Sequence, residues 1–187
     1  PDKGCDQISL FRFDPAAGRF SRHGATRAKA ASAPRHSASH PVKPLVYVAN
    51  ELDSTLTTYS WESKAGTLTP LHRISCLPAS FCGDSTAAGI VTSADGGTLY
   101  VSNRGHDSIA VCRLDSDSGL PAPIQFIATG GEEPRFITLD PAGRTLYVGN
   151  ENSDSITRFA VNARDGTLAS SGQPIASASP TCIVLAP

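Results

Sequence analysis

One short pattern recurs four times along the 187 residues and constrains the fold more than any other feature. Each copy begins with an Asn or Asp anchor and places an aliphatic residue six positions later. The anchors stand at positions 2, 50, 103 and 150, and the intervals of 48, 53 and 47 residues match β-propeller blades and exceed helical repeats such as ankyrin. The four copies are Asp2–Ile8, Asn50–Leu56, Asn103–Ile109 and Asn150–Ile156.

The pattern around each anchor predicts four short strands in each unit. In the last unit, an apolar run and a β-rich run flank a turn that contains Pro and Gly, and an alternating segment and a second turn follow. The same order recurs in the preceding unit, at Leu99–Asn103 and Ser108–Leu114, and we find no amphipathic helix. The sequence therefore predicts an all-β fold, a β-propeller of four-stranded antiparallel blades, with about three and a half to four blades present. In the last unit the expected strands are Arg135–Leu139, Leu146–Asn150 and Ser155–Val161, with an outer strand starting at Thr167.

We expect one partial propeller domain over residues 1–187. Its repeat units are approximately 1–33, 34–86, 87–133 and 134–179, with a closing strand at 180–187. The chain begins at Pro1 and contains no methionine, which favours a fragment of a larger ring over a complete four-bladed one. An open arc of blades exposes two blade faces and unpaired strand edges, so we expect self-association through them. We expect residues 22–29 to form a solvated loop without chemistry.

The composition excludes several classes of partner. The formal net charge of −1 gives no basic field that would attract nucleic acid. The longest apolar runs, such as Leu45–Ala49, are strand-sized and too short to cross a membrane. Five cysteines without a CxxC pair argue against a disulfide framework and a zinc site, and favour a reducing, cytoplasmic setting. Cys76 and Cys82 are close enough in sequence to bridge, but two separate thiols are the favoured interpretation.

The blade motifs resemble those of the lactonase family, which includes the 6-phosphogluconolactonase and carboxymuconate cyclase types. The resemblance covers nearly the whole chain, and the uninterrupted run from Asn103 to Val111 is its most specific part. It implies a seven-bladed propeller of which this chain is the C-terminal half. It also implies a small anionic sugar lactone as the substrate and no cofactor. The motifs are Pro34-Arg35-His36, Asn50-Glu51-Leu52, Asn103 to Val111, Pro134-Arg135 and Asn150 to Asp154.

Opening a lactone requires a base that activates water, a donor for the developing oxyanion and cations for an anionic group. His36 is the leading base candidate because the unperturbed pKa of imidazole lies near neutrality. Arg35 and Arg135 follow prolines at matched blade positions, where their guanidinium groups could bind an anion. We assign His36 and Arg135 to catalysis and Arg35 to substrate binding. The alternatives are a hydrogen-bonded histidine that lines the channel and salt bridges between blades.

The loops after the second strands should border the same end of the channel. From these loops we assign Glu51, Arg104 and His106 to substrate binding, because Arg104 and His106 break the repeat. The Arg-Gly-His order could equally be a turn with solvated side chains. We expect the repeated Asn50, Asn103, Asn150 and Asp154 to be structural, because Asn and Asp often fix turns through side-chain hydrogen bonds.

One position departs from the family pattern. Family members usually read Ala-Ala-Glu-Ile-His where this chain has Ala87 to Val91, so Gly89 replaces a carboxylate. Glu51, Glu132 or Glu133 could substitute for it.

Three functions remain open from the sequence. The first is a metal-independent lactone hydrolase of sugar metabolism, which opens 6-phosphoglucono-lactone to 6-phosphogluconate in the pentose phosphate pathway. The second is a noncatalytic propeller that binds a partner or ligand, which Gly89 favours. The third is a carboxymuconate cyclase-type enzyme that uses the same cations and base.

Overall fold

The computed structural model describes residues 1–185. Almost all of its regular structure is β-strand, preceded by a single 3-10 turn, η1 (Lys3–Cys5). The strands are β1 (Gln7–Asp14), β2 (Arg19–Arg27), β3 (Pro34–Ser39), β4 (Leu45–Asn50), β5 (Thr55–Glu62), β6 (Thr67–Ser75), β7 (Thr86–Thr92), β8 (Thr98–Arg104), β9 (Ser108–Leu114), β10 (Pro121–Ala128), β11 (Pro134–Leu139), β12 (Thr145–Asn150), β13 (Ser155–Val161), β14 (Leu168–Ser170) and β15 (Ile175–Ala176).

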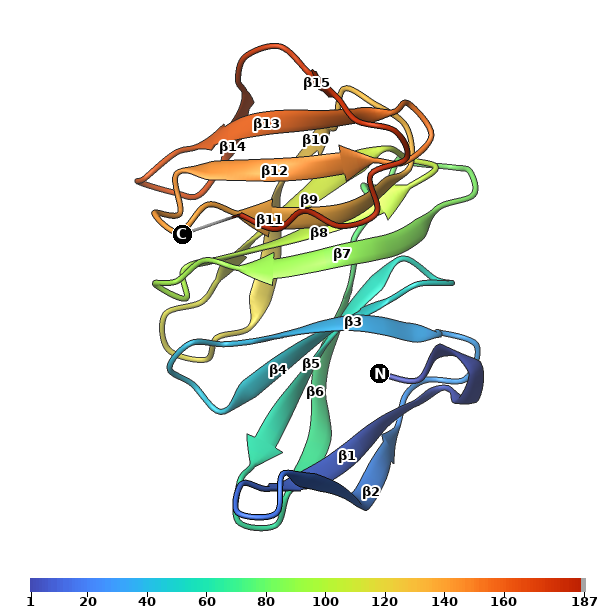
Figure 1. The fold of residues 1–187 in the computed structure, drawn as a ribbon, viewed down its shortest axis with the longest axis vertical. Helices are drawn as coiled ribbons and strands as arrows, with labels where there is room; N and C mark the ends of the chain where they lie inside the picture. Colours follow the sequence, from blue (N-terminus) through green and yellow to red (C-terminus); the bar gives the residue numbers. More distant parts are fainter. Residues whose placement is uncertain (186–187) are drawn as a thin grey trace.

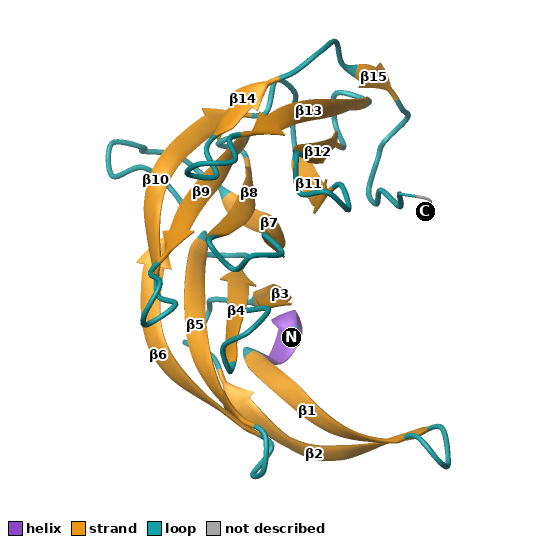
Figure 2. Ribbon diagram, turned by 90° about the vertical axis from the view of Figure 1, so that its left-hand side faces the viewer, coloured by secondary structure: helices purple, strands orange, loops and turns teal. Residues whose placement is uncertain are grey.

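The strands form antiparallel sheets that follow one another along the chain, as the predicted propeller fold requires (Figure 1). β1 and β2 make a two-stranded sheet, and β3–β6 and β7–β10 make four-stranded sheets. β11–β14 form the last sheet, in which β15 also pairs with β13. Figure 2 shows that the sheets form an arc, with β3, β7 and β11 on its concave side and β6 and β10 on its convex side. The prediction of an all-β propeller with four-stranded blades is confirmed.

Neighbouring sheets pack face to face through buried apolar side chains. Tyr47 packs in one cluster with Leu99, and Tyr100 packs in the next cluster with Leu146. Both tyrosines stand three residues before an anchor, and each hydroxyl reaches the following sheet. Tyr47 donates to the carbonyl of Gly119 at 2.7 Å, and Tyr100 donates to that of Gly166 at 2.9 Å. Burial raises the pKa of both hydroxyls to about 12. The blades are therefore joined by apolar packing and by a repeated hydrogen bond.

The repeated motif builds the link between successive blades. The residue four positions after each anchor is left-handed, with φ between 46° and 50°. In three units this residue is an Asp, and its carboxylate accepts a backbone N–H from the start of the next unit. The donors are Ala33, Glu133 and Ser179, each of which directly precedes a proline. In the other unit a Ser hydroxyl donates to a carbonyl just before β7. Asp and Asn tolerate left-handed backbone better than most residues, which explains why the motif keeps this position. The four residues are Asp6, Ser54, Asp107 and Asp154.

The structure differs from the sequence-based expectations at both ends. The expected loop at 22–29 is wrong for residues 22–27, which belong to β2 and pair with β1. Within the expected closing strand at 180–187, residues 180–185 form no strand, and residues 186–187 lie outside the described range. Ser179 is nevertheless fixed by Asp154, at 2.7 Å from N to Oδ1. The segment thus starts as an inner strand does, but no described strand lies beside it to complete a ladder.

Within residues 1–185, no helix is long and apolar enough to cross a membrane. All five cysteines are free thiols, as expected for Cys76 and Cys82. Cys76 is fully buried with the core between the second and third sheets, whereas Cys82 is exposed.

Candidate functional site

Each inner strand has an irregular register near its first residues. In β3 the bulge falls at Arg35, and in β11 it falls at Arg135. In β7 it includes Ala88 and Gly89. A bulge interrupts the alternation of side chains and re-aims the extra residue. The three inner strands therefore present their irregular residues at the same end of the sheets.

Antiparallel pairing brings the ends of β4, β8 and β12 to this same end. The anchors Asn50, Asn103 and Asn150 are buried there and act structurally. Asn50 Nδ2 donates to Thr57 Oγ1 at 2.9 Å, and Asn103 Nδ2 donates to the Cys76 carbonyl at 2.8 Å. The residue directly after each anchor is charged. Three of these four residues, Glu51, Arg104 and Glu151, lie at the ends of β4, β8 and β12, which pair with the bulged inner strands.

Glu51 is the centre of an ionic cluster at this end. Its Oε2 lies 3.1 Å from Arg35 Nε, and its Oε1 lies 3.0 Å from Arg104 Nη2 and 2.6 Å from Lys3 Nζ. The side chain of Glu51 is 9% exposed. Burial alone would raise the pKa of this carboxyl, but the adjacent positive groups of Lys3 and Arg104 outweigh it and lower the pKa. Glu51 is therefore an ionised counterion of three cations.

Two further carboxylates, Glu151 and Glu133, lie near Arg135 and Arg104. Arg135 Nη1 donates to Glu151 Oε2 at 3.0 Å, and Glu133 Oε2 lies 4.0 Å from Arg104 Nε. Burial is the main cause that lowers the pKa of Arg35, and the charges of Arg104 and Arg135 lower it further. The positive charges of Arg104 and Arg135 thus act on Arg35. We call this set the arginine cluster, and its members are Lys3, Arg35, His36, Glu51, Arg104, Glu133, Arg135 and Glu151.

His36 is held in its neutral form within the cluster. A guanidinium nitrogen of Arg35 lies 3.2 Å from Nδ1 and 3.3 Å from Nε2 of the imidazole. Burial lowers the pKa of His36 below its ordinary value of 6.5, and the charge of Arg35 lowers it further. A half-buried imidazole that is unprotonated near neutral pH is suited to accept a proton.

His106 lies apart from these contacts. Its Nδ1 is 2.6 Å from Ser108 Oγ, and its ring and that of Phe81 pack edge to face at a centroid distance of 4.5 Å. None of its described contacts reaches a member of the arginine cluster. The structure thus brings together five of the six predicted site residues, which are His36, Arg35, Arg135, Glu51 and Arg104, and leaves His106 with Phe81 and Ser108.

Gly89 allows two inner strands to approach closely. Its N–H donates to Ser102 Oγ at 2.8 Å. A Cβ atom at this position would lie 3.0 Å from both the backbone N and Cγ1 of Ile137 in β11. A side chain at position 89 would therefore require Ile137 to shift by a few tenths of an ångström, and glycine avoids this crowding between β7 and β11.

The sequence interpretation missed Lys3. The signal was present, because Lys3 follows the first anchor just as Glu51, Arg104 and Glu151 follow the other three. Of the three substitutes considered for the missing carboxylate, Glu51 is paired with three cations and Glu132 is exposed. Glu133 is the one that lies beside Arg104 and keeps partial exposure, at 31%.

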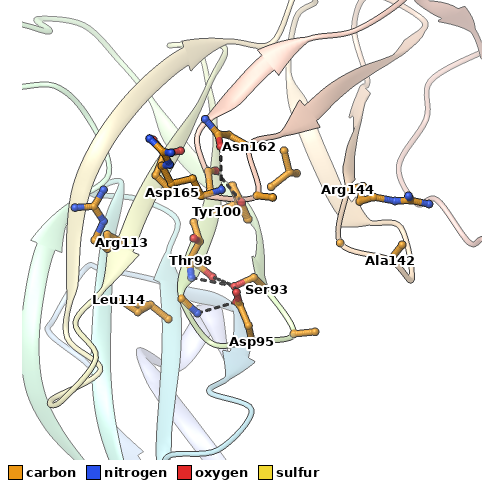
Figure 3. A pocket seen from close by; sticks show the side chains of 17 residues that line it. Ser93, Asp95, Thr98, Tyr100, Arg113, Leu114, Ala142, Arg144, Asn162 and Asp165 are labelled. Carbon is orange, nitrogen blue, oxygen red and sulfur yellow. Dashed lines mark hydrogen bonds between the residues drawn. The ribbon is translucent and has the colours of Figure 1, made fainter.

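A separate cavity of about 470 Å³ lies at the opposite end of the strands, between the third and fourth sheets. The turns after β7, β11 and β13 and the end of β9 line it. On one side, Ser93 is hydrogen-bonded to both Asp95 and Thr98 (Figure 3). The side chains of Arg113 and Arg144 extend from opposite sides of this cavity without converging (Figure 3). None of its lining residues belongs to the arginine cluster. Among residues 1–185, no group of three His, Cys, Asp or Glu side chains is placed to hold a metal ion.

Chemically, the arginine cluster combines a neutral imidazole with guanidinium groups that retain unused N–H donors. Such groups bind carboxylate and phosphate oxygens and stabilise negative charge that develops during a reaction. The arrangement therefore fits an anionic ligand whose reaction needs a base.

Comparisons with known proteins agree with this description. The family model described as "Lactonase, 7-bladed beta-propeller" matches residues 1–185. The 6-phosphogluconolactonase of Bacillus subtilis is 29% identical over 182 residues, which cover 97% of this chain and 52% of that protein. The chain thus spans about half the length of the curated relatives it matches.

Solved structures show the same likeness. The periplasmic gluconolactonase of Pseudomonas aeruginosa superposes with a TM-score of 0.90 at 29% identity, over 97% of this chain and 51% of that one. A protein from Lactobacillus plantarum superposes with a TM-score of 0.89 at 31% identity, over 95% of this chain and 51% of that one.

Proposed function

Because this chain belongs to the lactonase family of seven-bladed β-propellers, we propose that it is a lactone hydrolase of sugar metabolism that opens 6-phosphoglucono-lactone to 6-phosphogluconate. One observation carries the proposal: a neutral, half-buried His36 lies against Arg35 within a cluster of cations from successive blades. The similarity to a 6-phosphogluconolactonase and to a periplasmic gluconolactonase supports a sugar lactone as the substrate class.

In the proposed reaction, His36 accepts a proton from water, and the oxygen of that water attacks the lactone carbonyl carbon. The carbonyl π bond breaks, and its electron pair becomes the oxyanion of a tetrahedral intermediate, which Arg135 stabilises with N–H groups not used by Glu151. When the carbonyl reforms, the ring C–O bond breaks, and the protonated His36 returns its proton to the departing alkoxide. The products are a carboxylic acid, which then ionises, and a free hydroxyl.

The anionic end of the substrate is assigned to Arg35 and Arg104. Both guanidinium groups keep donors that Glu51 does not occupy, because each contributes one nitrogen to that carboxylate. A phosphate accepts several hydrogen bonds from such donors at once. We propose no cofactor for this reaction. We also propose that the chain acts in the pentose phosphate pathway and that it does so in the cytoplasm. Its five free thiols support the cytoplasmic location.

A noncatalytic binding role is the second candidate. Gly89 supplies no carboxylate, and each of the four Lys and Arg side chains of the cluster has a carboxylate oxygen within 3.1 Å, which favours a stable ionic network. A carboxymuconate cyclase would use the same cations and base to move a proton without net hydrolysis.

A substrate panel tests the proposal. The purified chain is given freshly prepared 6-phosphoglucono-lactone, unphosphorylated gluconolactone or a carboxymuconate, and each rate is corrected for the spontaneous reaction. The proposal predicts hydrolysis of both lactones, with the higher kcat/KM for the phosphorylated one. Turnover of the carboxymuconate alone would support the cyclase. No turnover by folded chain would support the binding role and overturn the proposal.

A further inference from the structure

Charge alternates in sign at one matched position of the four repeat units. The residue after each anchor is Lys3, Glu51, Arg104 and Glu151 in turn. The first three are in contact across the sheet boundaries, because Glu51 Oε1 lies 2.6 Å from Lys3 Nζ and 3.0 Å from Arg104 Nη2. The alternation in the sequence thus becomes a continuous ionic contact between three successive units.

Glu51 is engaged mainly by cations of the protein itself. Its second oxygen lies 3.1 Å from Arg35 Nε, so both carboxylate oxygens are engaged by cations. Its side chain is more than nine-tenths buried. This differs from the substrate-binding role that the sequence suggested for Glu51, and a carboxylate with a lowered pKa is also a poor proton acceptor.

The cations around Glu51, by contrast, have unused donors. The side chain of Arg104 is 10% exposed, and Nε and Nη2 make no hydrogen bond of acceptable geometry to the described residues, although Nη2 is within ion-pair distance of Glu51. Unsatisfied N–H groups on a buried charged side chain are costly, and an anion would satisfy them. Lys3 is 53% exposed and can donate two further hydrogen bonds.

The local charge also favours an anion. Three cations surround the single negative charge of Glu51. The next carboxylate, Glu133, lies 4.0 Å from Arg104 Nε and is 31% exposed, so it neutralises Arg104 only weakly. Even with Glu133 counted in full, positive charge remains in excess.

We propose that Glu51 is a positioning residue that gathers Lys3, Arg35 and Arg104 from three successive units into one binding site for the oxyanion group of the ligand. Lys3 becomes a ligand-contacting residue of the site. The inference rests on the proposed function for the identity of the ligand, whose oxyanion is a phosphate or a carboxylate. The carboxylate of Glu51 keeps three like charges together, and their remaining N–H groups converge on the anion.

Binding without turnover tests the site. Isothermal titration measures the affinity of the chain for inorganic phosphate and, separately, for acetate. Lys3→Gln is compared with Lys29→Gln, which removes the same charge from a 61% exposed lysine that pairs with Asp53 outside the cluster. We expect Lys3→Gln to weaken binding of the preferred anion about tenfold, from the loss of one charged hydrogen bond. We expect Lys29→Gln to stay near the wild type. Equal affinities of the two variants, or no binding of either anion, would overturn the proposal.

Glu51→Gln gives a test of opposite sign. If Glu51 positions the cations, its neutral replacement lets them separate, and phosphate binding weakens. If Glu51 only competes with the ligand for the cations, the same replacement strengthens binding and refutes the positioning role. Asp53→Asn, which removes a carboxylate paired with Arg73, is the matched control. The fluorescence of Trp61 confirms folding, and the Lys3→Gln comparison decides the question if Glu51→Gln does not fold.

These results separate the site from the proposed reaction. Phosphate binding that depends on Lys3, without hydrolysis of any lactone, would keep the site and remove the hydrolase function. Hydrolysis with affinities that do not depend on Lys3 or Glu51 would keep the function and remove the site.

Discussion

Replacing Asp107 with alanine should destabilise the chain by about 3 kcal/mol. The Asp107 carboxylate accepts the N–H of Glu133 at 2.9 Å and that of Gly105 at 3.2 Å. The first bond fixes the residue before β11 and is the stronger of the two, with about 1.5–3 kcal/mol typical for a hydrogen bond to a charged group. Asp107 is also left-handed, at φ 50°, where alanine costs about 1 kcal/mol or more. The exposed bond to Gly105 contributes little.

Equilibrium urea unfolding, followed by the fluorescence of Trp61, measures this loss. Asp107→Asn keeps an oxygen acceptor and a tolerance for left-handed backbone, so it should cost less than about 1 kcal/mol. Asp117→Ala, in an exposed turn, serves as the control and should be near neutral. An Asp107→Ala chain within about 0.5 kcal/mol of the wild type, the usual range of surface substitutions, would refute the idea that the motif joins blades through this carboxylate.

Further predictions concern the blade boundaries and pH. Tyr100→Phe removes the hydrogen bond to Gly166 and should cost about 1 kcal/mol in thermal unfolding. The pKa of His36 is lowered by burial, so the unfolded chain binds a proton at higher pH than the folded one, and stability should fall as pH decreases below 6.5. His36→Gln should reduce that slope in urea titrations at several pH values. The lowered pKa of Glu51 predicts a further loss below pH 4.5, which Glu51→Gln should reduce. The exposed phenylalanines of β1 and β2 and the unpaired edge of β1 predict concentration-dependent association, and a monodisperse species in sedimentation velocity would contradict it.

The repeat made most of the fold predictable. The strands expected at Ser155–Val161 and Ser108–Leu114 coincide with β13 and β9. Alternating apolar and polar side chains mark β13, whereas β9 is an almost wholly buried strand that its place in the repeat identified. The strand β2 was not predictable in this way. Nearly all of its residues are exposed, so no alternation between a buried and a solvent face marks it. Its pairing with β1, which lies earlier in the chain, holds it as a strand.

The candidate site was predictable by residue type but not by contact. Matched blade positions identified Arg35, Arg135 and His36, because the repeat places equivalent residues at equivalent ends of the inner strands. The sequence could not show that Glu51 pairs with three cations, because two of them, Lys3 and Arg104, come from other units. Nor could it show that His106 packs against Phe81 instead. Such contacts depend on the packing of one sheet against the next, and a local sequence pattern does not predict that packing.

The central claim is that His36 supplies the base for opening a lactone at the arginine cluster. The most direct measurement is kcat/KM for 6-phosphoglucono-lactone, corrected for spontaneous opening, in the wild type, in His36→Gln and in the exposed control His72→Gln. We predict a loss of about 100-fold or more in His36→Gln, as is typical for removal of a general base, and an unchanged value in His72→Gln. Wild-type activity in the His36→Gln chain would contradict the account.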